Sequence, residues 1–541
     1  MLMKKTKFIL WGLALMFAIM MSIPYLLPNC GLIALFAFVP LLCMEYIARQ
    51  ENIRHFWMYH YAAFVMWNAF TTFWVCNATV GGGIFAVLAN AFQMSLIFGL
   101  FHLSFKRLKK MLPYVFLAAM WIAWERFYFD AEISWPWLVL GNSFARSTWA
   151  VQWYEYTGTL GGSLWIWASN LGLFGLMLSI GDNSFYLWNS KAKFAAVAGY
   201  ALVLLLPLPA SALILKDYKE QEQAINKGDN LQVAIVQPNI DPYHKFDALS
   251  QEQQDSIFLT NAKPLMDSFK AEGNSAPVLL IAPETFTNMI EMHSVLQNNS
   301  VRRYLDFLQD YPWATMLFGA STYDVVASAH APTYTARPFG KGYWYETHNT
   351  AFTLNAQGKE EHFHKNKLVV AVEKTPYPAF FGKIDDLIGG VMGRNTGQGE
   401  VSLLHVGELP LGCAICYESI YGEYYTSYIR KGARAMAIIT NDAWWGDTPG
   451  YRQHLSYASL RAIETRRAIA RCANTGISAI ITPCGQIKDA TRYNELTSFK
   501  SSIPLRDDIT FFVEYGDICG RICTFIFCLL LLALAVEALK R

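Results

Sequence analysis

Three reactive side chains stand at the ends of short apolar segments that are typical of β-strands. Glu284 follows LLIAP, Lys365 lies between a polar stretch and LVV, and Cys416 ends GCAIC. A thiolate can attack a carbonyl, a carboxylate can accept the thiol proton, and an ammonium can stabilise the oxyanion that forms. The resulting thioester can pass its acyl group to a second nucleophile. An acid, an amine and a thiol at strand ends therefore suit acyl transfer.

Each of these residues also has a simpler interpretation. Glu284 could cap a following helix, Lys365 could be a solvated lysine at a sheet edge, and a buried Cys416 could pack as a small hydrophobe. Cys413 and Cys416 form a C-x-x-C pair, which can indicate a metal or redox site. Residues three apart on a strand point to opposite faces, and the sequence has no second C-x-x-C. We therefore expect neither a metal nor a cofactor.

The middle of the chain supplies the elements that would position these side chains. Short β-branched runs such as LQVAIVQ, PVLLIAPE and ARAMAIITND alternate with amphipathic stretches. Strands that alternate with helices predict an α/β domain in layers, and ligands in such folds gather beyond the carboxyl ends of the strands. The predicted helices cover residues 251–271, 301–311, 421–432 and 451–474.

The two ends of the chain have the apolar composition of membrane-spanning segments. Of the 541 residues, 53% are hydrophobic and 16% are charged, whereas about 25% charged is usual in soluble domains. The net charge of +2 gives no reason to expect a nucleic-acid partner. A spanning helix needs about 20 mainly apolar residues. Eight segments are candidates: Phe8–Leu27, Gly31–Ala48, Phe56–Ala78, Gly83–Leu103, Pro113–Phe127, Gly161–Ile180, Phe194–Leu215 and Ile518–Leu539.

The basic residues between these segments predict their orientation. Cytoplasmic loops carry an excess of Lys and Arg, and alternate connections carry nearly all of them here, whereas the other short connections carry only Arg146. Both termini should therefore be cytoplasmic and the middle domain should lie outside. The predicted domains are residues 1–216 with seven spans, 217–515 as the extracytoplasmic catalytic domain, and 516–541 with the eighth span. The basic start MLMKKTK could also mark a cleaved signal peptide, but further spans follow at once.

The order of the motifs resembles a known family. APETF, HKNKLVV and ICYE are followed by TNDAWWGDTPGYRQHLSYASLRAIETRRAIARCANTGISAIITPCG, and SWPWLVLGNS lies in the membrane half. The set is similar to the nitrilase superfamily and, within it, to the apolipoprotein N-acyltransferase family. The resemblance implies an αββα sandwich on an eight-helix bundle in a bacterial inner membrane, with the catalytic domain on the periplasmic side. It implies acyl transfer from a phospholipid, through a cysteine thioester, to the N-terminal amine of diacylated apolipoproteins, without a cofactor.

The resemblance also implies roles for individual residues. Glu284 is the general base, Lys365 the oxyanion partner and Cys416 the nucleophile. The supporting or substrate-binding residues are Glu373 as a further acid, Tyr417 as a second oxyanion donor through its N–H, Glu418 as a support of the turn or a direct participant, Asn441, Trp444 near the substrate entrance, and Phe246.

Two positions depart from the family pattern. Residues 369–373 read VVAVE where the family usually has VPFGE, and Phe246 stands where the family has a tryptophan. The loop that carries Glu373 should therefore be reshaped, and the lipid-binding surface near Phe246 should differ.

Two other classes of protein compete with the acyltransferase. A membrane-tethered nitrilase-type amidase would pass the acyl group to water, and a transporter or receptor would use the middle domain only to bind a ligand. The three reactive residues disfavour the transporter or receptor, because binding needs no activated thiol. Eight spans disfavour the amidase, because tethering needs only one.

Overall fold

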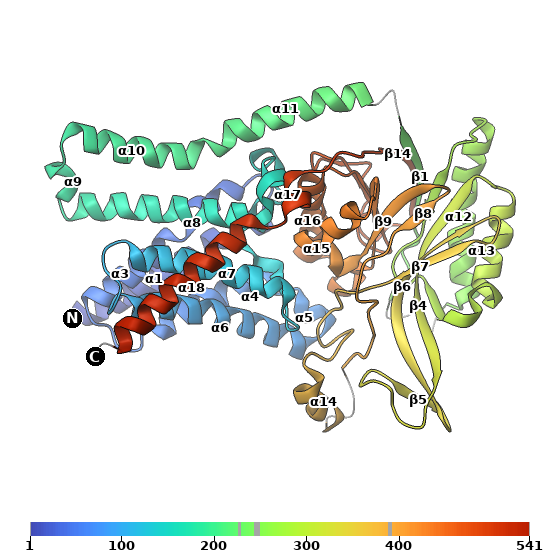
Figure 1. Ribbon diagram of the computed structural model, residues 1–541, viewed down its shortest axis with the longest axis horizontal. Helices are drawn as coiled ribbons and strands as arrows, with labels where there is room; N and C mark the ends of the chain where they lie inside the picture. The colour runs from blue at the N-terminus through green and yellow to red at the C-terminus, as the bar shows by residue number, and fades with distance from the viewer. Residues whose placement is uncertain (1, 226–228, 243–248, 388–391, 540–541) are drawn as a thin grey trace. The chain divides into compact units, whose positions relative to one another are not determined.

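The computed structural model describes residues 2–225, 229–242, 249–387 and 392–539, and it comprises two compact units (Figure 1). The first unit contains the residues up to Tyr218 together with those from Tyr515 onward, and the second contains Lys219–Glu514. Each is described below by itself.

The first unit is a bundle of long apolar helices. Helix α18 runs beside α7 and α8, and α4 lies between α1 and α6. Aromatic side chains fill the bundle: Phe17, Phe38, Phe64 and Trp67 meet edge to face, and Trp167 is fully buried. The longer helices are α1 (Leu2–Leu26), α3 (Val39–Gln50), α4 (Trp57–Thr72), α6 (Val80–Ser104), α7 (Leu112–Asp130), α8 (Tyr154–Gly181), α10 (Ser190–Leu205), α11 (Pro207–Ile225) and α18 (Ile518–Leu539).

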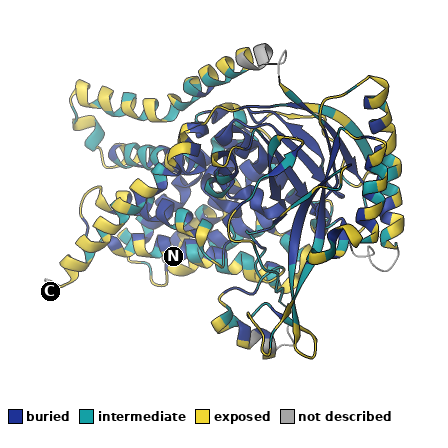
Figure 2. Ribbon diagram, turned by 45° about the vertical axis from the view of Figure 1, so that its right-hand side comes forward, coloured by how far each residue is buried: buried dark blue, intermediate teal, exposed yellow. Residues whose placement is uncertain are grey.

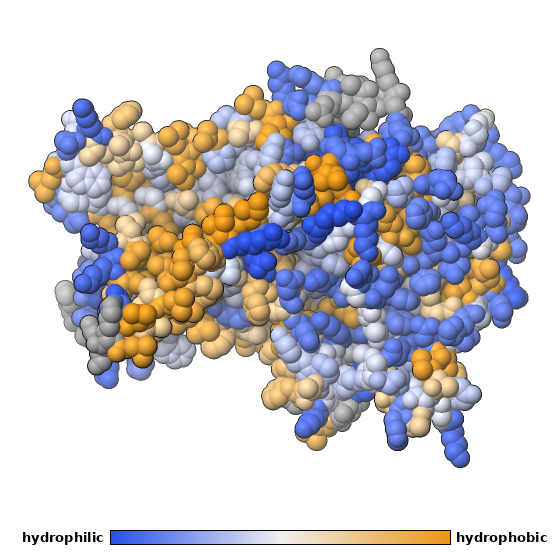
Figure 3. Space-filling model, in the orientation of Figure 1, coloured by the Kyte–Doolittle hydropathy of each residue, from blue (hydrophilic) through white to orange (hydrophobic). Residues whose placement is uncertain are grey.

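The bundle exposes apolar side chains outward as well as burying them. Figure 3 shows hydrophobic side chains along α18, and Phe525 and Leu532 on this helix are more than 60% exposed. A helix that is apolar on all sides is typical of a membrane span. Within the described residues, six helices are long and apolar enough to cross a membrane: Lys5–Leu26, Gly31–Gln50, Val80–Ser104, Tyr154–Gly181, Ser190–Glu220 and Ile518–Leu539.

The remaining two predicted spans are helical but fall outside this set. Helix α4 has 16 residues, and α7 has 19 residues and carries Glu125 and Arg126. The predicted total of eight spans is therefore not confirmed and stays a prediction.

The second unit contains two sheets, whose central strands are largely buried, whereas edge strands such as β5 and β13 are mostly exposed (Figure 2). The first has the order β14-β1-β2-β4-β6-β5, with β3 beside β4 and β7 beside β6. The second has the order β13-β12-β11-β10-β9-β8. The strands are β1 (Asn230–Gln237), β2 (Val278–Ile281), β3 (Thr287–Glu291), β4 (Ala314–Ala327), β5 (Arg337–Gly340), β6 (Tyr343–Asn355), β7 (Glu360–His364), β8 (Leu404–Val406), β9 (Leu409–Ile415), β10 (Ala435–Thr440), β11 (Ile469–Ala473), β12 (Ala479–Ile481), β13 (Ile487–Lys488) and β14 (Thr497–Pro504).

The sheets pack face to face, and helices cover their outer faces. One core cluster joins Val233 and Leu317 of the first sheet to Ile415 and Ile438 of the second. Another cluster joins the outer face of the first sheet to α12 and α13. The predicted αββα sandwich is confirmed. Its outer helices are α12 (Gln251–Ala271), α13 (Asn299–Gln309), α15 (Gly422–Arg430) and α16 (Pro449–Thr465).

The helix predicted for residues 451–474 is wrong in its second half. Helix α16 ends at Thr465, Arg466 adopts a left-handed φ of 49°, and the chain continues as β11. The segment IARCA is apolar enough for either structure, and pairing with β10 on one side and β12 on the other makes it a strand.

Candidate active site

The topology explains why Glu284 and Lys365 meet. Strand β2 runs parallel to β4, β6 is antiparallel to β4, and β7 is antiparallel to β6. Strands β2 and β7 therefore run in the same direction, and their carboxyl ends lie at the same edge of the sheet. Lys365 directly follows β7, and Glu284 follows β2 by three residues. The Lys365 Nζ lies 3.0 Å from the Glu284 Oε1.

A second carboxylate completes the pairing of Lys365. The Lys365 Nζ lies 2.9 Å from the Glu373 Oε2, and the Asn349 Nδ2 donates to both acids at 2.8 and 2.9 Å. Burial alone would lower the pKa of Lys365, but the Coulomb attraction of Glu284 and Glu373 outweighs it and raises the pKa well above its ordinary value. Lys365, which is 1% exposed, thus carries a permanent positive charge.

Close backbone packing positions Glu284. A Cβ on Gly319 in β4 would lie 2.6 Å from the Glu284 Cα, so only glycine allows this approach. The backbone N–H of Asn441 donates to the Glu284 Oε2 at 3.1 Å. The carboxylate is therefore fixed on both oxygens.

The departure from the family pattern at residues 369–373 still produces a tight loop. The N–H of Glu373 donates to the carbonyl of Val369, and the N–H of Val369 donates to the Glu373 Oε2 at 2.8 Å. Ala371, which stands at the phenylalanine position of the family pattern, takes a left-handed φ of 64°, unusual for a residue other than glycine. The reshaped loop brings the Glu373 carboxylate to Lys365.

Cys416 stands on a strained turn directly after β9. Its φ of 51° is unusual for a residue other than glycine. Burial and the nearby Glu284 raise the pKa of the Cys416 thiol well above its ordinary value, and Lys365 opposes them. The resting thiol is thus protonated, beside a carboxylate and an ammonium. Cys413 lies deep in the core. A Cβ on its neighbour Gly412 would lie 2.9 Å from the Tyr428 Cβ of α15, so Gly412 faces the helix layer and Cys413 faces the first sheet.

Glu418 ties the nucleophile turn to the loop that follows β7. Its carboxylate accepts backbone N–H groups of Ile415, Asn366 and Lys367 and the hydroxyl of Tyr424. Protein donors thus occupy the Glu418 carboxylate oxygens. This favours a role in supporting the turn over a direct role in catalysis.

Sequence reasoning missed a buried network behind Cys416. The Asp442 carboxylate accepts from the His454 Nδ1 at 2.9 Å and from the Arg471 Nη2 at 2.6 Å. The His454 Nε2 lies 3.1 Å from the carbonyl oxygen of Cys416. Cys416, Asp442 and His454 also have the spacing of a metal cluster, but both histidine nitrogens already contact protein groups. Asp442, His454 and Arg471 lay within a quoted motif and Asn349 lay outside the quoted motifs, and none gave a separate signal as a polar residue within or beside an apolar strand.

The remaining predicted site residues have varied positions. Asn441 directly follows β10, and its side chain accepts from the Asn474 Nδ2 at 3.2 Å. Tyr417 is buried beside Tyr421, whereas Trp444 is 41% exposed. Phe246 lies outside the described residues.

Comparison with known proteins gives this arrangement a family. The model of the carbon-nitrogen hydrolase family matches residues 232–503, about half of the chain. The chain belongs to the carbon-nitrogen hydrolase family. A second model, the apolipoprotein N-acyltransferase N-terminal domain, matches residues 13–172. The two matches together confirm the resemblance to that branch of the carbon-nitrogen hydrolases.

Two curated relatives match this chain over most of its length, and a solved structure matches about half of it. The apolipoprotein N-acyltransferase of Chlorobaculum tepidum is 28% identical, over 93% of this chain and 92% of its own length. That of Geobacter metallireducens is 26% identical, over 75% of this chain and 71% of its own. A crystal structure of Nit3 from Saccharomyces cerevisiae, a nitrilase-superfamily member, is 14% identical over 51% of this chain and 91% of its own, with a TM-score of 0.36. The full-length relatives are enzymes, and the first unit of this chain has several helices apolar enough to cross a membrane. The chain is therefore a membrane-bound enzyme.

Proposed function

We propose that the protein transfers an acyl chain from a membrane phospholipid to the N-terminal amine of diacylated apolipoproteins, through a thioester on Cys416. The observation that carries the mechanism is the buried Lys365, held between Glu284 and Glu373 next to a protonated thiol on a strained turn. Relatives along nearly the whole chain bear the name of this reaction, which favours it over an amidase.

In the first half-reaction, the Cys416 Sγ attacks the ester carbonyl carbon and its proton passes to Glu284. Lys365 and the N–H of Tyr417 stabilise the oxyanion. The ester C–O bond breaks, Glu284 returns the proton to the leaving oxygen, and lysophospholipid departs. Glu373 balances the charge of Lys365, so that this ammonium does not simply donate a proton to Glu284.

In the second half-reaction, a neutral amine attacks the thioester and Glu284 takes its proton. The C–S bond breaks, the Cys416 thiolate recovers the proton, and an amide forms. The protein must keep water from the thioester until the amine arrives. We propose that aromatic side chains such as Trp444 help to exclude water from the acyl chain, and that the catalytic domain lies on the periplasmic side of a bacterial inner membrane.

The partition of the acyl-enzyme tests the transfer. With phospholipid alone, purified protein in detergent should release one lysophospholipid per active chain and then stall. A diacylated lipopeptide with a free N-terminal amine should restart turnover and yield an amide, and the same peptide with an acetylated amine should not. Steady release of free fatty acid, at a rate that the lipopeptide leaves unchanged, would show a hydrolase instead.

A further inference from the structure

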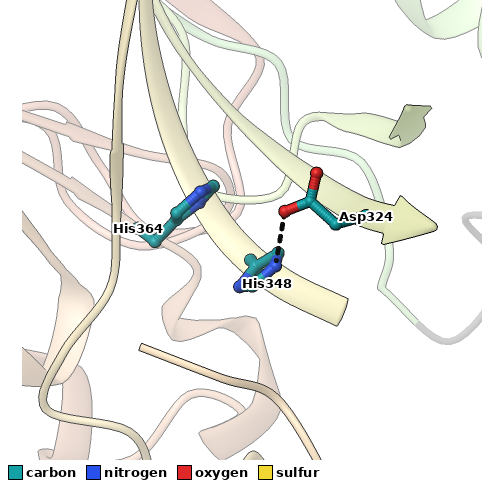
Figure 4. Close-up of side chains that lie close together, drawn as sticks. All are labelled: Asp324, His348 and His364. Atoms are coloured by element: carbon teal, nitrogen blue, oxygen red, sulfur yellow. Dashed lines mark ion pairs between the residues drawn. The ribbon is translucent and has the colours of Figure 1, made fainter. Parts of the chain in front are cut away.

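A second cluster of ligating side chains lies on the face of the first sheet opposite to Lys365. In the registers of β4 with β6 and of β6 with β7, Thr322 pairs with His348 and Thr350 pairs with His364. Alternate residues of a strand point to opposite faces, so Asp324, His348 and His364 share one face. Figure 4 shows the three side chains converging from neighbouring strands. Their ligating atoms all lie within 4.8 Å of one another.

The contacts of His348 fix which nitrogen faces the cluster. Its Nδ1 lies 2.8 Å from the carbonyl oxygen of Thr396, which can only accept, so Nδ1 carries a proton. The Nε2 is buried, makes no hydrogen bond among the described residues, and lies 3.2 Å from the Asp324 Oδ2. In neutral His348, Nε2 therefore holds a lone pair beside a carboxylate oxygen, without the alignment of a direct hydrogen bond. This contact needs a cation between the two atoms or a proton on Nε2.

The separation of these two atoms matches a shared metal ion. Zinc binds histidine nitrogen and carboxylate oxygen at about 2.0–2.2 Å, which places two ligands of one tetrahedral ion about 3.3–3.5 Å apart, close to the 3.2 Å between these atoms. A backbone carbonyl that accepts the other N–H is also the usual partner of a metal-binding histidine. The side chain of His348 is 7% exposed, so its ring is already oriented.

His364 supplies the second nitrogen. Its Nδ1 is hydrogen-bonded to the Thr350 hydroxyl at 2.8 Å, and that hydroxyl contacts Thr322 at 2.7 Å. The rings of His348 and His364 stack with centroids 4.2 Å apart.

Asp324 leaves room to complete the coordination. Its side chain is 32% exposed, and the His293 Nε2 lies 4.0 Å from its other oxygen. Two imidazoles and one carboxylate with open positions suit divalent ions of the zinc, iron, cobalt and nickel type. We propose that Asp324, His348 and His364 bind one divalent transition-metal ion, with water or His293 as a further ligand.

The site adjoins the catalytic strands without sharing their side chains. His348 precedes Asn349, and His364 precedes Lys365, whose N–H donates to the carbonyl of Asn349 at 2.8 Å. A bound ion would tie β4, β6 and β7 together directly behind Lys365 and Asn349. Its role is to hold these strands in register, and the proposal does not depend on the reaction assigned to Cys416.

The test uses the full chain in detergent, purified without a histidine tag and freed of metal with a chelator. Calorimetric titration with Zn²⁺ should give one ion per chain, and X-ray absorption of the zinc-loaded protein should show nitrogen and oxygen ligands without sulfur. Zinc should also raise the thermal unfolding midpoint. Asp324→Asn and His364→Gln should each raise the Kd at least tenfold and abolish the thermal shift.

His405→Gln is the matched control, because His405 pairs with Glu361 outside the cluster and its loss should leave the Kd unchanged. The exposed position of Asp324 makes Asp324→Asn the variant most certain to fold. Absence of stoichiometric binding would leave a simple His348–Asp324 ion pair and overturn the proposal. Sulfur in the coordination shell, or an unchanged Kd in both ligand variants, would overturn it equally.

Discussion

At the scale of single residues, the charge of Lys365 holds the site together. Two carboxylates converge on this buried ammonium, and the Asn349 amide donates to both of them. Removal of one partner from a buried ion pair is costly, because it leaves an uncompensated charge. Here it would leave two carboxylates facing each other.

Lys365→Met should therefore abolish acyl transfer and lower the free energy of unfolding by about 3–5 kcal/mol. Adding Glu373→Gln removes one of the facing charges, so the double variant should regain part of the stability but no activity. Thermal unfolding in detergent and the transfer assay measure the two effects. Lys359→Met is the control, because Lys359 is 63% exposed. Equal stability of the single and double variants would contradict the charge-balance account.

Glu284 and Cys416 could be singled out from sequence because each reactive side chain directly follows an apolar run. Lys365 follows the half-polar strand β7, and the resemblance to the family was needed to single it out. Asp442 and Arg471 could not be singled out, since their ion pair joins residues 29 positions apart and is visible only in the folded protein. The role of Glu373 was doubtful because the loop lacks the usual Pro and Gly, and the folded loop nevertheless brings its carboxylate to within 2.9 Å of the Lys365 Nζ.

At the scale of elements, the Asp442 network fixes β9, β10, β11 and α16 around the nucleophile turn. Burial would raise the pKa of Asp442, but Arg471 and His454 outweigh it and hold the pKa well below the ordinary value of 3.8. Folding thus favours the ionised carboxylate. Its contribution to stability is fully present above the unfolded value and is lost as the pH falls below it.

Asp442→Asn should lower the free energy of unfolding by about 3–5 kcal/mol at pH 7, because Arg471 stays buried without its counter-charge. The difference from the wild type should shrink as the pH falls below about 4. Asp447→Asn is the matched control: this aspartate is 68% exposed and pairs with Arg452 at the surface, so its loss should change stability little. A pH-independent difference for Asp442→Asn would contradict the assignment.

Element boundaries were predictable where local signals were strong. The helix predicted for residues 251–271 matches α12, which begins with a capping box between Ser250 and Gln253. The division between α16 and β11 was not predictable, because no Gly or Pro marks the turn at Arg466. The short strands β3, β5 and β7 are half polar and were also missed, and sheet pairing rather than apolar patterning defines them.

At the scale of the whole molecule, the orientation in the membrane remains a prediction from basic loops. A reporter enzyme that is active only outside the cytoplasm should work when fused after Asp217 or Tyr515 and should be silent after Arg541. Fusions after Thr79 and Glu132 test the contributions of α4 and α7. Both should be active if each helix crosses the membrane, and a silent fusion at either position would contradict the count of eight spans.

The central claim is that Cys416 carries the acyl group. The most direct measurement is mass spectrometry of the protein after incubation with phospholipid alone, followed by proteolysis and treatment with neutral hydroxylamine, which cleaves thioesters. We predict one hydroxylamine-sensitive acyl chain on Cys416, retained in Cys413→Ala, whose side chain is packed within the core between the sheets, and absent in Cys416→Ala. An acyl chain on Cys413 or on a hydroxyl side chain, or full transfer activity in Cys416→Ala, would contradict the account.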